Sequence, residues 1–275
     1  MSSALAFATP RPGESARWAA FWGRPQPARD ASPGEVRRTV VDARGAIVGA
    51  LAGRLDGPDR FVVHGLRARP DAAPALAAHL AALAPRIEVG LWAHDLDAAL
   101  HAALRAAGFA PVVEVVRVER RLEDLPPDAG ALTLRRLAST GAAVLRAAVS
   151  RCLAGTRNRP APADADVLLD GAAAHGVVGR WSVAFLGERP AGVVLPVVRE
   201  GRGSLALVGV VPALRGRGLA RPLLALGLAE LAAAGATLYA DGTDIENEPM
   251  WRTFAALGCQ YLGTEHRLVK EHAHG

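Results

Sequence analysis

A glycine-rich turn, between a stretch rich in Val and Leu and one rich in Ala and Leu, is the part of this sequence best suited to bind a ligand. It reads Val210-Val-Pro-Ala-Leu-Arg-Gly-Arg-Gly-Leu-Ala220, which predicts a strand, a turn and a helix in immediate succession. A helix start leaves backbone N–H groups unpaired and carries partial positive charge, so it suits a pyrophosphate. Gly216 and Gly218 would let the backbone approach the phosphates, and Arg215 and Arg217 would add charge. The segment therefore predicts an anion-binding loop.

Two common phosphate-binding motifs do not fit this turn. It lacks the Gly-Lys-Ser/Thr ending of a P-loop, and its glycine spacing is not the G-x-G-x-x-G of a dinucleotide-binding fold. Pro222 is compatible with the first turn of the helix that follows. The plain structural alternative for these residues is a solvated turn between a strand and a helix.

Two motifs in this half of the chain resemble those of the GNAT (GCN5-related N-acetyltransferase) family. Arg215-x-x-Gly218-x-Ala220 resembles the R/Q-x-x-G-x-G/A loop that holds the pyrophosphate of CoA in that family. The segment from Asn247 to Gly258 resembles the second family motif, N-x-x-A-x-x-x-Y-x-x-L-G-F. The resemblance implies acetyl-CoA or another acyl-CoA as co-substrate, bound by Val210, Val211, Arg215, Gly216, Arg217, Gly218, Leu219, Ala220, Asn247, Met250 and Phe254.

The resemblance also implies a mechanism, in which the acceptor amine attacks the thioester carbonyl directly. The backbone N–H of Val211, at the end of the strand, would polarise that carbonyl. Asn247 would contact the pantetheine arm or nearby backbone, unless it only caps the following helix. Family members often have a tyrosine that protonates the leaving thiolate, but position 254 is Phe254, which has no donor.

The residue that accepts the proton of the amine is not evident from the motifs. The strand 204–211 lacks the glutamate that often serves as base in the family. Asp241, Asp244 and Glu246 are the nearest acidic candidates, although such a cluster is more often a solvated loop or a cap. Other residues have mainly structural interpretations: Tyr239 and Tyr261 as packing residues, His64 as a structural histidine, and Arg157-Asn-Arg159 as a surface loop rather than an acceptor wall.

The order of predicted elements in residues 131–275 also appears in residues 1–122, so the chain reads as an internal repeat joined by a linker at 123–130. In the second half we expect strands at 181–186, 191–198, up to 211, at 237–240 and near 266–269, with helices at 218–234 and 248–257. In the first half we expect strands at 37–42, 46–51, 61–64, 87–92 and 112–118, with helices at 73–83 and 96–106. This predicts a mixed α/β fold of two tandem GNAT-like domains, each a mostly antiparallel sheet flanked by helices. The residues 63–73 lack the R-x-x-G-x-G/A pattern, so the first half reads as a degenerate copy that has lost the phosphate loop.

Composition narrows the remaining function classes. The chain has 275 residues, of which 51% are hydrophobic, and a formal net charge of +5. Its arginines are scattered among acids without a basic run, so we expect no nucleic-acid partner. No signal sequence or membrane-spanning stretch is evident, so we expect a cytoplasmic protein, and the abundance of Ala, Gly, Pro and Arg favours a bacterial source. Cys152 and Cys259 show no metal-ligand spacing, so we expect no metal and read both as small core residues.

The leading function is an N-acyltransferase that moves an acetyl or other small acyl group from acyl-CoA to the amine of a small-molecule acceptor. A CoA-binding scaffold with weak or no turnover is the second interpretation, because Phe254 replaces the tyrosine and the glutamate is missing. Transfer from an aminoacyl-tRNA is the third, suggested only by the basic charge balance, and it would require RNA binding with a steep salt dependence. A homodimer is compatible with the sequence, which does not reveal the acceptor or the acyl group.

Overall fold

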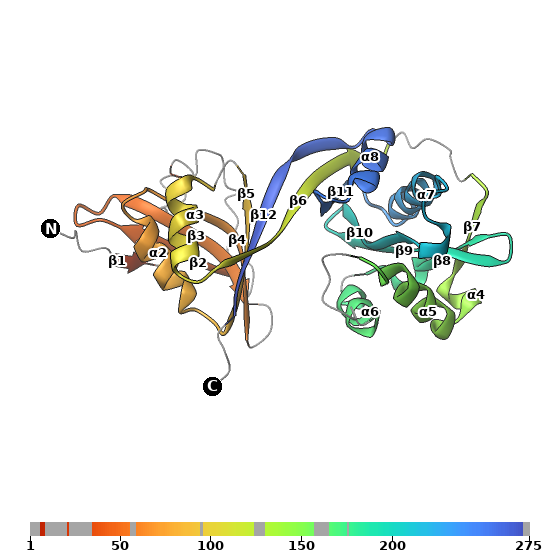
Figure 1. Cartoon of the computed structure of the whole chain (residues 1–275), viewed down its shortest axis with the longest axis horizontal. Coiled ribbons are helices and arrows are strands. Elements are labelled where there is room, and N and C mark those ends of the chain that lie inside the picture. The colour runs from red at the N-terminus through yellow and green to blue at the C-terminus, as the bar shows by residue number, and fades with distance from the viewer. Residues whose placement is uncertain are drawn as a thin grey trace. The chain divides into compact units, whose positions relative to one another are not determined.

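The computed structural model describes residues 6–8, 21, 35–55, 59–93, 96–123, 130–156, 165–174 and 176–271. The described elements form two compact units, made of residues 1–115 with 264–275 and of residues 116–263 (Figure 1). In both units a mainly antiparallel sheet is flanked by helices, which confirms the predicted mixed α/β fold. None of the helices in the described ranges has the length and apolar character needed to cross a membrane.

The first unit has the strand order β1-β2-β3-β4-β5-β12. Its strands are β1 (Ala6–Ala8), β2 (Glu35–Val41), β3 (Ile47–Leu55), β4 (Arg60–Ala68), β5 (Arg86–Trp92) and the end of β12 (Gln260–Glu271). All neighbouring strands are antiparallel except β4 and β5, which pair in parallel. Helices α2 (Ala73–Ala81) and α3 (Ala98–Ala106) bury their apolar faces in one core with the sheet.

The second unit has the strand order β6-β11-β10-β9-β8-β7. Its strands are β6 (Ala110–Arg121, from Val116 on), β7 (Leu132–Arg136), β8 (Ser182–Leu186), β9 (Arg189–Arg199), β10 (Arg202–Val210) and β11 (Leu238–Asp244). Its helices are α4 (Leu137–Thr140), α5 (Ala142–Leu153), α6 (Ala165–Ala173), α7 (Ala220–Ala233) and α8 (Glu248–Ala256), with short 3₁₀ turns at Val178–Arg180 and Pro212–Leu214. One core cluster contains side chains of α5 and of α7 together with the strands.

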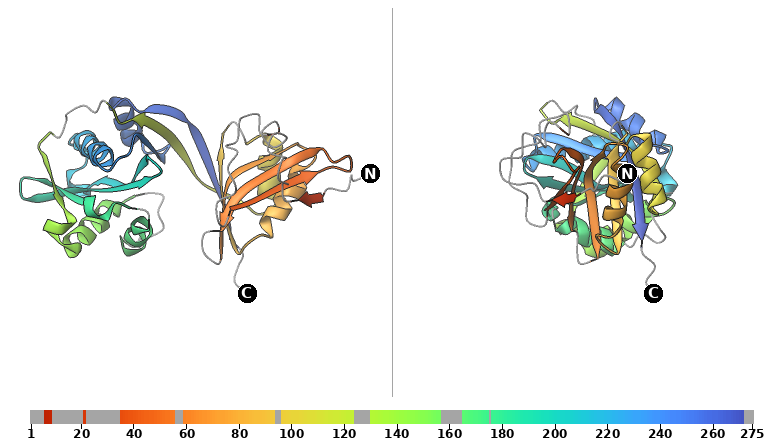
Figure 2. Two further views of the ribbon diagram at one scale, coloured as in Figure 1. Left: turned by 180° about the vertical axis from the view of Figure 1, so that it is seen from behind. Right: turned by 90° about the vertical axis from the view of Figure 1, so that its left-hand side faces the viewer.

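The division into units differs from the predicted boundaries at both ends. Residues 116–122 belong to the second unit, and residues 264–275 belong to the first, where β12 pairs antiparallel with β5 from Glu265–Trp92 to Glu271–Arg86. The end of the chain can be followed into the first unit in Figures 1 and 2. The repeat in the sequence identified the strands but gave no information on which sheet each terminal strand joins. Most of the predicted linker, residues 124–129, lies outside the described residues.

Equivalent glycines support the internal repeat. A Cβ at Gly49 on β3 would lie 3.4 Å from Leu76 of α2, and a Cβ at Gly192 on β9 would lie 2.9 Å from Leu223 of α7. In both units a glycine therefore lets the sheet pack closely beneath the helix that follows the central strands. Gly108 and Gly258 likewise end α3 and α8 with positive φ values, as helix C-caps do.

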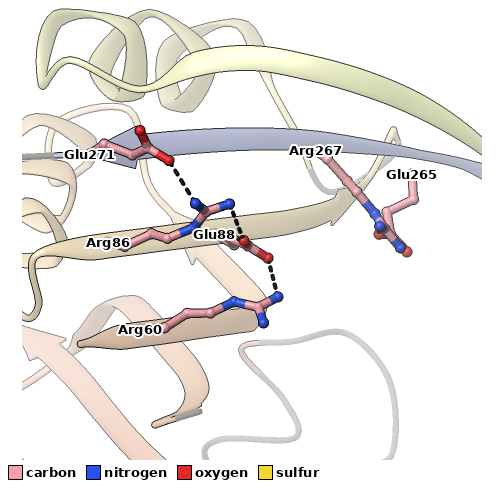
Figure 3. A network of polar contacts seen from close by, with 6 residues as sticks. All are labelled: Arg60, Arg86, Glu88, Glu265, Arg267 and Glu271. Carbon is pink, nitrogen blue, oxygen red and sulfur yellow. Dashed lines mark hydrogen bonds and ion pairs between the residues drawn. The ribbon is translucent and has the colours of Figure 1, made fainter. Parts of the chain in front are cut away.

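A chain of ion pairs crosses three strands of the first unit (Figure 3). Arg60 of β4 contacts Glu88 of β5 at 2.5 Å, Glu88 contacts Arg86 at 2.9 Å, and Arg86 contacts Glu271 of β12 at 2.7 Å. Burial alone would raise the pKa of Glu88, but the hydrogen bonds and charges of the two arginines outweigh it and hold that pKa below its ordinary value. This network joins the parallel strand pair of the first unit to β12.

Gly192 provides a test of the close packing in the second unit. In Gly192→Ala the new methyl group would lie 2.5 Å from the carbonyl oxygen of Gly209 and 2.9 Å from Leu223, so β9, β10 and α7 must separate. We expect a loss of about 1–3 kcal/mol in the free energy of unfolding, measured by urea denaturation. Gly171→Ala on α6 is the control, because no atom lies within 4 Å of the added methyl group, and it should not destabilise the chain. Equal urea midpoints for Gly192→Ala and the wild type would contradict this packing.

Candidate functional site

The parallel strands β10 and β11 separate after only two pairs of residues. Arg202 pairs with Leu238 and Gly203 with Tyr239, although the strands have 9 and 7 residues. Beyond this point the backbone edge of β10 needs other partners. Asp241 of β11 supplies one, because its carboxylate accepts a hydrogen bond from the N–H of Leu205 at 2.9 Å. The separation opens a split beside the strand that leads into the glycine-rich loop.

A β-bulge in β10 determines which side chains face which helices. The pairing with β9 shifts between Leu205 and Leu207, so Ala206 is an extra residue. Before the bulge, a Cβ at Gly203 would contact Leu231 of α7; after it, a Cβ at Gly209 would contact Cys152 of α5. Side chains at even-numbered positions of β10 therefore face α6 before the bulge, and side chains at odd-numbered positions face α5 after it.

The bulge also corrects the predicted role of the Val211 amide. The N–H of Val211 donates to the carbonyl of Ala191 on β9 at 2.9 Å, so it is already paired. Because successive backbone groups of a strand point in opposite directions, the N–H groups of Val208 and Val210 point away from β9, toward the split. The carbonyl of Val210 is consistent with this direction, since it accepts a hydrogen bond from the side chain of Arg215. The amides of Val208 and Val210 therefore replace that of Val211 as candidates to polarise a carbonyl group.

The glycine-rich loop has the backbone geometry expected of an anion-binding site. Gly216 and Gly218 both have φ values of +74°, where side chains other than glycine are strained, and a Cβ at either would meet no atom within 4 Å. Helix α7 begins at Ala220 without a side-chain cap, and Leu219 occupies the N-cap position. Residues 215–218 are exposed and no side chain caps the helix start, as phosphate binding requires.

The two arginines of the loop have different surroundings. Arg215 is held by backbone carbonyls: its guanidinium donates to Val210 at 3.1 Å, to Cys152 at 2.9 Å and to Ala154 at 3.2 Å. The last two carbonyls belong to the C-terminal end of α5, where a positive charge is favourable. The side chain of Arg215 therefore fixes the loop to α5 and is not directed at a ligand, which corrects its predicted role. Arg217 is exposed and has no hydrogen bond or ion pair with a described residue, so it can still face a phosphate.

The second motif forms helix α8, but its residues lie differently from the expectation. Phe254 is only 2% exposed and packs in the core, with its ring centroid 6.3 Å from that of Tyr239. As placed here, the phenyl ring offers no surface to a cofactor, so the expected pantetheine wall is not visible at this position. Met250 is partly buried against the same core. The side chain of Asn247 does not cap α8 but donates to the hydroxyl of Thr243 at 2.9 Å. Asn247 is exposed at the start of the helix.

The three candidate acids have distinct environments. Asp244 accepts a hydrogen bond from the N–H of Glu246 at 2.9 Å, which is the geometry of a turn, and Glu246 itself is exposed. Asp241 lies at the split and accepts from Leu205, from the N–H of Gly242 at 2.8 Å and from the hydroxyl of Tyr239 at 3.3 Å. Burial raises the pKa of Asp241, and it outweighs these hydrogen bonds and the charge of Arg117, which lower it.

The remaining predicted residues are mostly structural. Cys152 is buried, donates to the carbonyl of Gly209 at 3.2 Å and has its pKa raised by burial to about 12, so its role as a core residue is confirmed. Tyr239 is fully buried, whereas Tyr261 is 63% exposed and is not the packing residue we expected. The side chain of His64 is 52% exposed and lies 3.9 Å from Glu35. The segment Arg157-Asn-Arg159 lies outside the described residues, which contain no cluster of three metal-ligating side chains.

A cavity that sequence reasoning missed lies where the split begins. It has a volume of about 420 Å³ and is lined by α6, β9 and β10 through Leu168, Gly171, Ala172, Val197, Arg199, Ser204 and Ala206. The two β10 residues follow the last β10–β11 pair directly, so the cavity adjoins the split on the α6 face. A larger cavity of about 700 Å³ includes Leu238, where β11 begins, and Gly258, and thus lies away from the split. No local sequence pattern marks the smaller cavity, because its walls come from three separate segments.

The first unit lacks the glycine-rich loop. Between β4 and α2 the chain runs through Arg69, and the N–H groups of Ala72 and Ala73 both donate to the carbonyl of Arg69, at 2.9 and 3.0 Å. Both alanines are fully buried. The start of α2 is therefore closed by the chain itself, which supports the interpretation of the first half as a copy without a phosphate site.

Comparison with known proteins agrees with this geometry. Residues 147–259 match the model of the acetyltransferase (GNAT) family. Over these residues the second half of the chain is similar to GNAT acetyltransferases. The chain is also similar to the mycothiol acetyltransferase of Mycolicibacterium gilvum (strain PYR-GCK), with 29% identity over 74% of this chain and 71% of that protein.

Solved GNAT structures have the same fold as this chain. A GCN5-related N-acetyltransferase from Sphaerobacter thermophilus has a TM-score of 0.65 at 17% identity, over 97% of this chain and 95% of the other. A tandem GNAT protein from the clavulanic acid biosynthesis pathway has a TM-score of 0.54 at 17% identity, over 98% of both chains. The tandem GNAT architecture predicted from the repeat is thereby confirmed, and at these identities the likeness concerns the fold alone.

The raised pKa of Asp241 leads to a prediction about stability. The folded protein binds this proton more tightly than the unfolded chain does. The proton on Asp241 therefore stabilises the folded protein fully at pH values below the pKa of this group in the unfolded chain, which is about 4. This stabilisation is lost as the pH rises through the higher pKa of the folded protein. The unfolding free energy of the wild type should fall relative to that of Asp241→Asn, which cannot ionise, as the pH rises from about 4 toward neutrality. Urea denaturation of both proteins across this range measures the difference, and a constant difference would refute the assignment.

Proposed function

We propose that the second half of this chain binds an acyl-CoA and transfers an acetyl or other small acyl group to the amine of a small-molecule acceptor. The observation that carries this proposal is the combination of an open glycine loop at the start of α7 with the split between β10 and β11. Phosphates of CoA would bind the N–H groups between Gly216 and Ala220, with Arg217 as the available charge. The cavity beside Ser204 and Ala206 would receive the acceptor.

In the proposed reaction the neutral amine attacks the thioester carbonyl, a C–N bond forms and the C–S bond breaks. The amide of Val208 or Val210 would stabilise the charge that develops on the carbonyl oxygen. None of the described residues that line the acceptor cavity is a carboxylate, and Phe254 has no donor, so in this proposal water takes the proton from nitrogen and supplies one to the thiolate. Asp241 then acts as a positioning residue that holds the amide of Leu205 where the strands separate.

The glycine loop is tested by a matched pair of substitutions at the two ends of α7. Gly218 and Gly235 have φ values of +74° and +88°, and a Cβ at either position would meet no atom within 4 Å. Gly218→Ala and Gly235→Ala thus carry a similar backbone strain, of about 1–2 kcal/mol. We expect Gly218→Ala to weaken acetyl-CoA binding at least tenfold, because the methyl group obstructs the approach of the phosphates, whereas Gly235→Ala should bind like the wild type. Calorimetry should also give one CoA site per chain; two sites, or equal affinities in both variants, would exclude the assignment.

Turnover separates the enzyme from a CoA-binding scaffold. The scaffold is favoured by the burial of Phe254 at the tyrosine position and by the absence of an acidic residue in β10. Release of free thiol from acetyl-CoA, measured across a panel of amines, should rise with pH as the amine loses its proton if transfer occurs. Acetyl-CoA binding without thiol release for any amine would establish the scaffold instead.

A further inference from the structure

Two arginines stand directly opposite each other at the end of the β9–β10 hairpin. The turn between them consists of Glu200 and Gly201, whose φ values of 48° and 75° fit a two-residue hairpin turn with both residues left-handed. Such a turn fixes the register, and Arg199 pairs with Arg202 across it. Opposed residues of an antiparallel pair lie on the same face, with their Cβ atoms about 5 Å apart.

This face of the hairpin is the wall of the acceptor cavity. Val197 and Arg199 line the cavity from β9, and Ser204 lines it from β10 directly opposite Val197. Arg202 is two residues from Ser204 and therefore points to the same side. Arg199 thus lines the cavity at its hairpin end, and Arg202 stands opposite Arg199 on the same face of the hairpin.

Neither of these arginines has a partner of opposite charge among the described residues. Two like charges directly opposite each other destabilise a sheet. Both side chains are exposed, and neither has a hydrogen bond or ion pair with any described residue, whereas the arginines Arg135, Arg136 and Arg180 of the same unit all contact a glutamate. The described residues that line the cavity include no acid, and apart from Arg199 and Ser204 they are apolar. A carboxylate would relieve the repulsion and bind both guanidinium groups, as arginine binds carboxylates elsewhere.

We infer that the acceptor is an amine that also carries a carboxylate, which Arg199 and Arg202 bind while the amine is directed to the split. The inference rests on the proposed function and specifies its substrate class. The apolar wall formed by Leu168, Ala172 and Val197 would contact the aliphatic part between the two groups. A volume of about 420 Å³ suits a small molecule of this kind. Polyamines are disfavoured, because a second ammonium group would meet two positive charges.

A binding experiment tests this inference without requiring turnover. The full chain, saturated with CoA, is titrated by calorimetry with 6-acetamidohexanoate and with 6-acetamidohexanamide, which differ only in the charge of one end. We expect the carboxylate to bind at least tenfold more tightly than the amide. Arg199→Gln and Arg202→Gln should each remove most of this preference. Arg189→Gln is the matched control, since Arg189 is an exposed arginine at the other end of the same strand and should leave the preference unchanged. Equal binding of both probes, no binding of either, or an unchanged preference in Arg199→Gln would overturn the inference.

Turnover then distinguishes the two proposals. Thiol release from acetyl-CoA is measured with 6-aminohexanoate, 6-aminohexanamide and 1,6-diaminohexane. A carboxylate preference in binding with no thiol release supports the substrate-binding site and contradicts the transferase. Equal turnover of the three amines supports the transferase and contradicts the carboxylate site.

Discussion

The early separation of β10 from β11 is the constraint on which the arrangement of the site depends. A parallel pair that ends after two residues leaves backbone groups of both strands without their usual partners, and such groups are costly to bury unpaired. Asp241 offsets part of this cost, because its carboxylate binds the amide of Leu205 where a backbone carbonyl would otherwise lie. Burial in turn disfavours the charged form of the Asp241 carboxyl group and raises its pKa. The strands can therefore remain apart without a ligand between them.

The bulge at Ala206 converts this separation into a site with two sides. It places Ser204 and Ala206 on the α6 face, at the cavity proposed for the acceptor, and then directs the amides of Val208 and Val210 toward the split. The same strand leads directly into the glycine loop, and Arg215 fixes that loop to the end of α5 through three backbone carbonyls. One strand thus connects the cavity beside α6, the candidate carbonyl-polarising amides and the glycine-rich loop, and a shift of its register would displace all three.

Local features of the site could be predicted from sequence, and features that depend on register could not. The glycine loop, the hairpins and the glycine caps follow from residues close together in the chain, and the elements appear near their expected positions. A single extra residue in β10, however, reverses the direction of every later amide, so Val211 was assigned a role that the neighbouring amides can fill. The partners of Arg215 come from a helix more than 60 residues away in the chain. The sequence also does not show that the end of β6 belongs to the second unit and the end of β12 to the first, because each strand has the same pattern whichever sheet it joins.

The starts of α7 and α2 differ in the surroundings of their backbone N–H groups. At α7, two exposed glycines with positive φ lead into a helix start that no side chain caps. At α2, buried alanines replace them, and the first amides bind the carbonyl of Arg69. These hydrogen bonds pair the backbone N–H groups that an anion would otherwise bind, so they stabilise the start of α2 and leave fewer donors for a ligand. Its parallel strands also keep four pairs and are joined by the ion pairs of Arg60, Glu88 and Arg86, where the second unit keeps two pairs. The first unit therefore satisfies internally the backbone groups that the second unit leaves available to a ligand.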